Sequence, residues 1–287
     1  MSKGRWSKRG SSKGGLGLVA LAAWLAMSAG AAPAADQALY PDWQGAWARF
    51  VVRGLGGQPS FDQTKPWGLG QEAPLTAEYR KILEDSIADQ AQGGQGNFAE
   101  HAQCYPAGMP LMMVAFRPLE FVVTPQTTYV LVGGSDHYRR IFTDGRDWPS
   151  DITPSYSGYS IGRWTNAGGG HNDTLEIETR GFKGRRAYDA TGLPLHFDNQ
   201  SIIKERIHLD PSDPNIMHDE TTVIDHALTR PWTVDKKYLR RPNPRPDWEE
   251  AYCALVTIGG EMYYLDGDGL LMPARKGQKA PDLRHFK

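Results

Sequence analysis

Alternating apolar and polar residues dominate the C-terminal part of the chain. In the segment DTLEIETRGF, Leu175, Ile177 and Thr179 alternate with charged residues, which is typical of a half-buried β-strand. Similar short segments follow one another, separated by turn signals such as Asp144-Gly145. We therefore predict an all-β fold of about ten strands, mostly sequential and antiparallel. Such a meander closes into an up-and-down barrel or forms a strongly curved sheet, and closure removes the exposed strand edges.

One segment has helical periodicity instead. The residues PLTAEYRKILEDSIADQ (74–90) place their apolar side chains on one stripe: Tyr79, Ile82, Leu83 and Ile87. Thr76 is suited to cap the N-terminus of this helix, and the glycine-rich AQGGQGN that follows ends it. A first strand is predicted in DWQGAWARFVV (42–52). Residues 36–287 are thus expected to form a single β-barrel domain, with one N-terminal helix and strands mainly in 117–272.

The hairpin QSIIKERIHLDPSDPNIMHDETTVID (200–225) has a register that its own residues indicate. We centre the turn on Asp213, which makes one face charged and internally paired, as a solvent face should be. Its pairs are His208 with His218, Arg206 with Glu220, and Lys204 with Thr222. The other face is apolar except for Glu205, opposite Thr221, and for Asp219. A slip of one residue would turn both strands over and undo this separation.

Two carboxylates on an apolar face need an explanation, because burying a carboxylate costs several kcal/mol unless it is paired, hydrogen-bonded or protonated. In one interpretation an inward arginine, Arg140 or Arg146, forms a structural ion pair with Glu205. In the other, Glu205 is a general acid/base tuned by Asp219, or a polar anchor for a ligand. His196, in LPLHFDNQ just before this strand, could then lie at the same rim and move a proton.

Four residues are candidate ligand contacts: Arg146, Trp148, Arg163 and Thr221. Arg146 and Trp148 belong to the turn TDGRDW and could bind an anionic or ring-bearing ligand at the mouth of a barrel. Alternatively, Arg146 only pairs with a carboxylate at this turn. Arg163 and Trp164 point to opposite faces of one strand, so only one of them can enter the lumen.

Familiar catalytic and metal-binding motifs are missing from the sequence. It contains no H-E-x-x-H, H-x-H or Cys/His cluster, so we predict no metal and no cofactor. It contains no G-x-S-x-G either. Ser160 in GYSIG runs into a predicted strand, whereas a nucleophile elbow needs a strand, a sharp turn and a helix. A serine hydrolase of that class is therefore not expected.

The first 35 residues have the three-part pattern of a secretory signal peptide. MSKGRWSKRGSSKGG carries five basic residues and no acid, LGLVALAAWLAMSAG is a short apolar run, and AAPAA offers small residues suited to cleavage. The alternative is an uncleaved membrane anchor, for which the apolar run is short. No later segment is apolar over a length that could cross a bilayer. We expect a periplasmic or secreted protein whose mature chain begins between Ala32 and Asp36.

Export changes how the charges and the cysteines are interpreted. The signal holds five of the 32 basic residues and none of the 33 acidic ones, so the mature chain is mildly acidic and has no electrostatic footprint for nucleic acid. Cys104 and Cys253 fit one disulfide in an exported chain. It would close a loop of about 150 residues and stabilise the fold by several kcal/mol. The alternative is two separate buried thiols.

Several motifs together resemble those of an uncharacterised family of exported bacterial β-rich proteins: GAWARF, CYPAGMP, RRIFTDGRDWP, GYSIGRW, DTLEIETRGF, KERI and LTRPW. The resemblance covers most of 42–255 and implies an architecture, with both cysteines where this family tends to have them. The Gly-x-Trp triplet GAW (45–47) on the predicted first strand is similar to that of lipocalins. This second resemblance implies a lipocalin-like barrel with a ligand-sized interior.

Three functional hypotheses differ in what the interior must contain. In the first, the protein is a binding module that holds a small, largely apolar molecule in its lumen. In the second, it is an acid/base enzyme of the hydratase, lyase or isomerase type that uses Glu205, Asp219 and His196. In the third, it is a structural envelope protein with a packed lumen. A cavity with ion-paired acids favours the first hypothesis, and a cavity with unpaired acids favours the second.

Overall fold

The fold was analysed in a computed structural model. The structure describes residues 39–50, 72–94, 96–98, 106–115, 117–134, 137–166, 172–184, 186–189, 191–243, 248, 254–258, 261–265, 271–273 and 279. The predicted signal peptide, Cys104 and Cys253 lie outside these residues. Among the described residues, no helix combines the length and the apolar character needed to cross a membrane.

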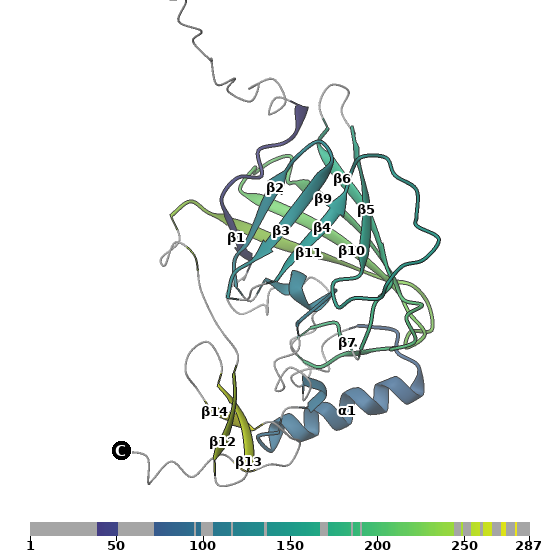
Figure 1. Cartoon of the computed structure of the whole chain (residues 1–287), viewed down its shortest axis with the longest axis vertical. Coiled ribbons are helices and arrows are strands. Elements are labelled where there is room, and N and C mark those ends of the chain that lie inside the picture. Colours follow the sequence, from purple (N-terminus) through teal and green to yellow (C-terminus); the bar gives the residue numbers. More distant parts are fainter. Residues whose placement is uncertain are drawn as a thin grey trace, which may run out of the picture. The chain divides into compact units, whose positions relative to one another are not determined.

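Nine strands form a closed barrel (Figure 1), with the strand order β1-β11-β10-β9-β6-β5-β4-β3-β2. The strands are β1 (Ala46–Arg49), β2 (Leu119–Val123), β3 (Thr127–Val132), β4 (Tyr138–Phe142), β5 (Tyr159–Thr165), β6 (Thr174–Arg180), β9 (Ile202–Leu209), β10 (Ile216–Ile224) and β11 (Trp232–Arg241). The barrel closes because β1 pairs with both β2 and β11. The predicted all-β barrel with one helix is therefore confirmed.

Two features of the strand arrangement differ from a simple meander. β4 and β5 pair in parallel, whereas the other neighbouring strands of the barrel are antiparallel. The last predicted strands do not join the barrel, and β12 (Ala254–Ile258), β13 (Glu261–Leu265) and β14 (Leu271–Pro273) form a separate three-stranded sheet. Both edges that could receive them are occupied, because β1 already pairs with β11 and with β2.

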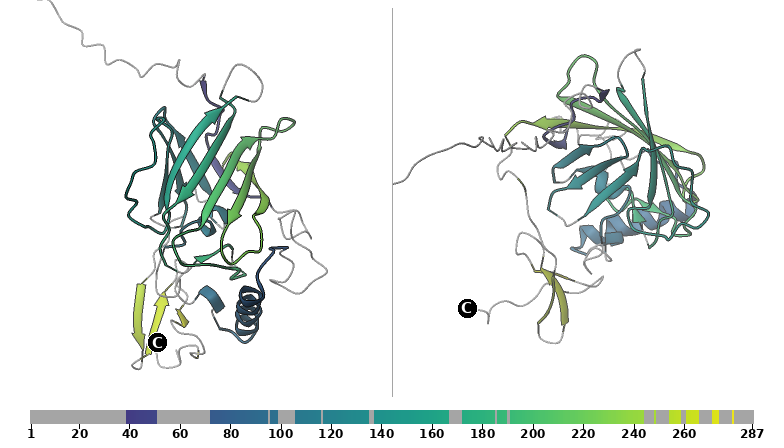
Figure 2. Two further views of the ribbon diagram at one scale, coloured as in Figure 1. Left: turned by 90° about the vertical axis from the view of Figure 1, so that its right-hand side faces the viewer. Right: turned by 45° about the horizontal axis from the view of Figure 1, so that its top comes forward.

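The predicted helix is present as α1 (Ala77–Ala91), with Thr76 as its N-cap. The Thr76 hydroxyl accepts a hydrogen bond from the backbone N–H of Tyr79 at 3.4 Å, which satisfies one of the free amides of the first turn. Tyr79 and Leu83 belong to a hydrophobic cluster with Val223 and Trp232 of the barrel. The helix thus packs where β10 turns into β11 (Figure 2).

Residues 109–115 contribute to the barrel core although they belong to no strand. They include the short 3-10 helix η4 (Leu111–Val114), and Met109, Met112 and Met113 are buried among strand side chains. Unbranched methionine side chains fill irregular gaps, which suits a non-strand segment that packs against the barrel core. The remaining elements are η2 (Gly96–Phe98) and the two-stranded sheet of β7 (Arg186–Ala187) and β8 (Pro194–Leu195).

The hairpin of β9 and β10 has the predicted register. Thr221 faces Glu205, Asp219 faces Ile207, and the outward pairs also match. Glu205, Asp219 and Thr221 are all buried, with exposed fractions of at most 3%. The alternation of apolar and polar residues along this hairpin therefore places two carboxylates inside the barrel.

Candidate functional site

Glu205 forms a buried, bidentate ion pair with Arg139 of β4. The two carboxylate oxygens lie 2.8 and 2.5 Å from Nη1 and Nη2 of the guanidinium. Arg139 also donates to the hydroxyl groups of Ser160, at 3.1 Å, and Thr179, at 2.7 Å. Both side chains of the pair are at most 1% exposed. Glu205 is therefore held in a buried ion pair with an inward arginine, which is the first of the two interpretations of this residue.

The arginine itself differs from the two that the sequence suggested. Arg140 and Arg146 were the candidates, but Arg139 is the inward residue, because Arg139 and Ile141 occupy the buried face of β4 and Arg140 is exposed. The segment HYRRIF offers two adjacent arginines, and alternation alone does not say which one faces inward. Arg146 is instead exposed and pairs with Asp144 at 2.6 Å.

Asp219 lies one strand away and is held by neutral groups. Its Oδ1 accepts a hydrogen bond from the Thr221 hydroxyl at 2.9 Å, and its Oδ2 accepts one from the Tyr238 hydroxyl at 2.9 Å. The Tyr238 oxygen also lies 2.6 Å from the carbonyl of Met113, so one hydroxyl links β11, β10 and the segment around η4. Burial, and next the negative charge of Glu205, raise the pKa of Asp219 to about 7.

Lys236 is directly opposite Asp219 across β10 and β11, and it is 1% exposed. Its Nζ has no hydrogen-bond partner within the part of the chain that the structure describes, and neither has the hydroxyl of Tyr188. Nζ lies 4.8 Å from the centre of the Tyr188 ring, within the range of a cation–π contact. Burial lowers the pKa of Lys236, although the acids around it oppose the shift.

This interior therefore contains a second acid with an altered pKa as well as an ion pair. Asp219, with its pKa raised to about 7, can take up or release a proton near neutral pH, and burial lowers the pKa of the lysine opposite it. Lys236 is not among the site residues predicted from the sequence. Its signal is present in WTVDKKYLRR, where Trp232, Val234, Lys236 and Tyr238 are alternate residues of one strand.

A separate aromatic cleft lies at the end of the barrel where β1 begins. Its volume is about 310 Å³, and it is lined by Tyr40, Pro41, Asp42, Trp43, Gln44, Phe121, Val123 and Pro125. The Trp43 ring is 5.3 Å from that of Phe121 and 4.8 Å from that of Trp164, and the Trp164 ring is 5.2 Å from that of Tyr40. Four aromatic rings thus pack against one another at this mouth, in tilted and edge-to-face arrangements.

The two tryptophans of the mouth carry unused hydrogen-bond donors. Nε1 of Trp43 and Nε1 of Trp164 are both buried and lack an acceptor among the described residues. A buried donor without a partner costs about 1–3 kcal/mol, so such groups are uncommon in folded proteins. By contrast, the indole N–H of Trp47 in the same region donates to the carbonyl of Trp43 at 3.0 Å.

The other predicted ligand contacts are divided between the two sides of the barrel wall. Thr221 is inside, bonded to Asp219. Trp148 lies under the guanidinium of Arg180, 4.6 Å from the ring centre, and it packs near the ring of Tyr159 at 6.0 Å. Arg163 is an exposed residue of β5 that pairs with Glu176 at 3.5 Å. Arg146, Trp148 and Arg163 therefore do not meet Glu205 and Asp219 in the barrel interior.

His196 also lies apart from the two acids. It follows β8, and its ring neighbours are Tyr79, Phe197 and His226 at 5.7, 5.1 and 5.6 Å. The described contacts of His196 include neither Glu205 nor Asp219. The structure thus brings Glu205, Asp219 and Thr221 together, and it places His196 with Asp198 and His226 instead.

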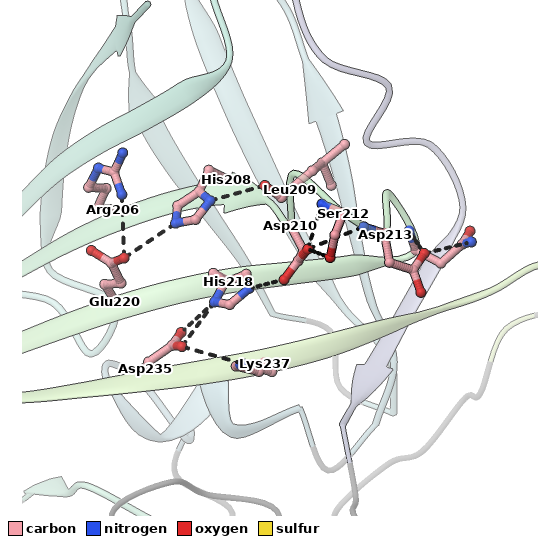
Figure 3. Close-up of polar contacts among 11 residues, drawn as sticks. Arg206, His208, Leu209, Asp210, Ser212, Asp213, His218, Glu220, Asp235 and Lys237 are labelled. Carbon is pink, nitrogen blue, oxygen red and sulfur yellow. Dashed lines mark hydrogen bonds and ion pairs between the residues drawn. The ribbon is translucent and has the colours of Figure 1, made fainter. Parts of the chain in front are cut away.

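The outward face of the β9–β10 hairpin carries a polar cluster (Figure 3). The rings of His208 and His218 stack with their centres 4.9 Å apart. His218 lies between two carboxylates, with Nε2 3.0 Å from Asp210 and Nδ1 2.9 Å from Asp235. Hydrogen bonds from the Ser212 hydroxyl, then from His218, hold the pKa of Asp210 well below its usual range. These contacts tie the β9–β10 turn to β11 on the outside of the barrel.

Comparison with protein-family models finds no match for this chain, and comparison with curated proteins finds none either.

Proposed function

We propose that the protein binds a small, largely apolar molecule at the mouth of its barrel, in the cleft formed by Tyr40, Trp43 and Phe121. The observation that carries this proposal is the aromatic wall of the cleft, in which Trp43 packs against Phe121 and Trp164. Specific pockets combine mainly apolar walls with a few polar groups that orient the ligand, and a volume of about 310 Å³ lies in their usual size range. We expect a ligand with one ring or a short apolar chain.

The position of the site follows from how the rest of the lumen is filled. Trp47, Met113 and Ile207 are each fully buried in the barrel core, and the inward acid Glu205 is ion-paired. The deeper interior thus resembles the packed lumen of the structural hypothesis. The mouth remains as the place where a cleft has an aromatic wall, which favours binding there over binding at the barrel centre.

Export is part of this proposal. The basic, apolar and small-residue segments of residues 1–35 support a cleaved signal peptide, and a periplasmic or secreted barrel would meet its ligand outside the cytoplasm.

The test uses two conservative tryptophan variants. Wild-type protein purified from its native envelope is examined by native mass spectrometry for a co-purified molecule, and 1-anilinonaphthalene-8-sulfonate serves as a fluorescent apolar probe. Trp43→Phe keeps an aromatic ring and removes the N–H, and Trp148→Phe is the matched control outside the cleft. We expect weaker capture only in Trp43→Phe, by roughly 5–10-fold, because the smaller ring removes apolar surface from the wall of the cleft. Equal capture by both variants, or none by the wild type, would refute the proposal.

A second candidate, the acid/base enzyme, is favoured by one observation. Asp219 has a pKa raised to about 7, and Lys236 opposite it has an amine without a hydrogen-bond partner among the described residues. Asp219 would then exchange the proton, while Glu205 would balance the charge of Arg139. A screen for hydration, elimination and isomerisation should show turnover that Asp219→Asn abolishes without lowering the melting temperature. Unchanged turnover in this variant would reject the role of Asp219.

A further inference from the structure

Two histidines and one aspartate converge at the end of the barrel that α1 covers. One ligand atom of each of His196, Asp198 and His226 lies within 4.8 Å of the others. The Asp198 oxygens lie 3.1 Å from Nδ1 of His196 and 2.5 Å from Nδ1 of His226. The residues come from two connections, because His196 and Asp198 precede β9 and His226 follows β10. This spacing in sequence explains why no metal motif was visible there.

A buried network holds the backbone beside both histidines. The Asp225 carboxylate accepts hydrogen bonds from the backbone N–H groups of His196 and Ala227, each at 2.8 Å, and from the hydroxyl of Ser201. Arg186 donates to the carbonyl of His196 and lies 3.9 Å from Asp225. The side chains of Arg186 and Asp225 are 3% and 0% exposed. The three candidate ligands thus stand on a scaffold that is fixed before any ligand binds.

The cluster has an electrostatic conflict that a cation would relieve. Nδ1 of His196 accepts the backbone N–H of Asp198 at 3.1 Å, so it bears a lone pair rather than a hydrogen. The same nitrogen lies 3.1 Å from a carboxylate oxygen of Asp198, which is also electron-rich. Moving a proton to this nitrogen would satisfy the carboxylate and leave the amide without its acceptor. An imidazole nitrogen has one lone pair, so an ion bound by Nδ1 and by the Asp198 carboxylate would take the place of the amide contact and compensate both electron-rich atoms.

We propose that His196, Asp198 and His226 bind one divalent transition-metal ion of the zinc type. Two imidazoles and one carboxylate are a ligand set that such ions prefer, and three protein ligands leave a position open for water or a substrate. Bonds of about 2.0–2.2 Å place tetrahedral ligand atoms about 3–3.5 Å apart, which matches the contact between His196 and Asp198. The 2.5 Å contact between His226 and Asp198 is shorter than this, so the His226 side chain, which is 62% exposed, must move outward to complete the set.

An exposed aromatic ring lies beside the cluster. Phe197 stacks on His196 with ring planes 2° apart, and it is 62% exposed. A ring beside a metal ligand suits a substrate that combines a metal-binding oxygen with an aromatic group.

The experiment measures Zn²⁺ binding to full-length mature protein without a polyhistidine tag, after treatment with a chelator. Isothermal titration should give one ion per chain, and Co²⁺ should give the visible absorption of a low-symmetry site with nitrogen ligands. His226→Gln and Asp198→Asn should each weaken binding at least 10-fold. His137→Gln is the matched control for the loss of one imidazole, and His218→Asn tests the stacked pair on the outer face; both should bind as the wild type does.

Two results would overturn the proposal. One is a wild type that binds no stoichiometric Zn²⁺, and the other is a loss of binding in His218→Asn with full binding in His226→Gln. Melting curves of all variants show that they are folded, and His226→Gln should melt near the wild type in the absence of metal because its side chain is largely exposed.

Discussion

The buried ion pair of Glu205 and Arg139 makes a sharp prediction about stability. Glu205→Gln keeps the size of the side chain and removes its charge, so the guanidinium stays buried with only neutral acceptors from Ser160 and Thr179. Breaking a buried pair by neutralising one partner costs about 3–5 kcal/mol. In a domain of this size each kcal/mol lowers the melting temperature by about 2–4 °C, so the expected decrease is about 6–20 °C.

The control is the same substitution at an exposed pair. Glu176 lies on β6 and pairs with Arg163 at 3.5 Å, and their side chains are 48% and 79% exposed. Surface pairs contribute about 0–1 kcal/mol, so Glu176→Gln should change the melting temperature by a few degrees at most. The contrast between the two variants isolates burial as the cause.

A double variant separates the charge from the packing. Arg139→Met combined with Glu205→Gln leaves no buried charge at this position, and replacing buried pairs by apolar groups is often neutral. We expect the double variant to recover at least half of the stability lost in Glu205→Gln, measured by urea unfolding. If Glu205→Gln melts like Glu176→Gln, the pair is not buried as described. The same conclusion follows if the double variant loses as much stability as Glu205→Gln and Arg139→Met lose together.

Three further predictions concern other parts of the chain. Burial and the charge of Glu205 raise the pKa of Asp219 to about 7, so the folded state binds this proton more tightly than the unfolded chain does. The resulting stabilisation of the folded state is complete below about pH 4. About 4 kcal/mol of it is lost as the pH rises from there through 7. Urea unfolding between pH 4 and 8 should show this loss in the wild type and not in Asp219→Asn. Cys104 and Cys253 should be bonded in the exported protein, so thiol labelling under non-reducing denaturation should find no free thiol, whereas two reactive thiols would contradict the pairing. Intact-mass measurement of the envelope fraction should find a mature chain that begins between Ala32 and Asp36, and not at Met1.

The pattern of the sequence determined the elements of the fold because local structure depends on local periodicity. Period-two alternation identified the barrel strands, the stripe on 74–90 identified α1, and the charges of the β9–β10 hairpin fixed its register. A one-residue slip would have placed Lys204 and Arg206 in the core, so the register had a strong local signal.

Only the tertiary structure decided which residues meet. Arg139 rather than Arg140 faces Glu205, because the inward face of β4 is set by its pairing with β3 and β5. β12 to β14 are excluded from the barrel because β1 closes it, which no local pattern records.

The two candidate ligand sites have the same origin. The aromatic mouth joins residues before β1 with β2 and β5, and the cluster of His196, Asp198 and His226 joins two connections separated by a hairpin. Contacts of this kind depend on how the barrel closes and on which loops its ends bring together. The sequence by itself therefore determined the strands and the inward acids, and barrel closure decided which of these groups became an ion pair and which gathered into sites.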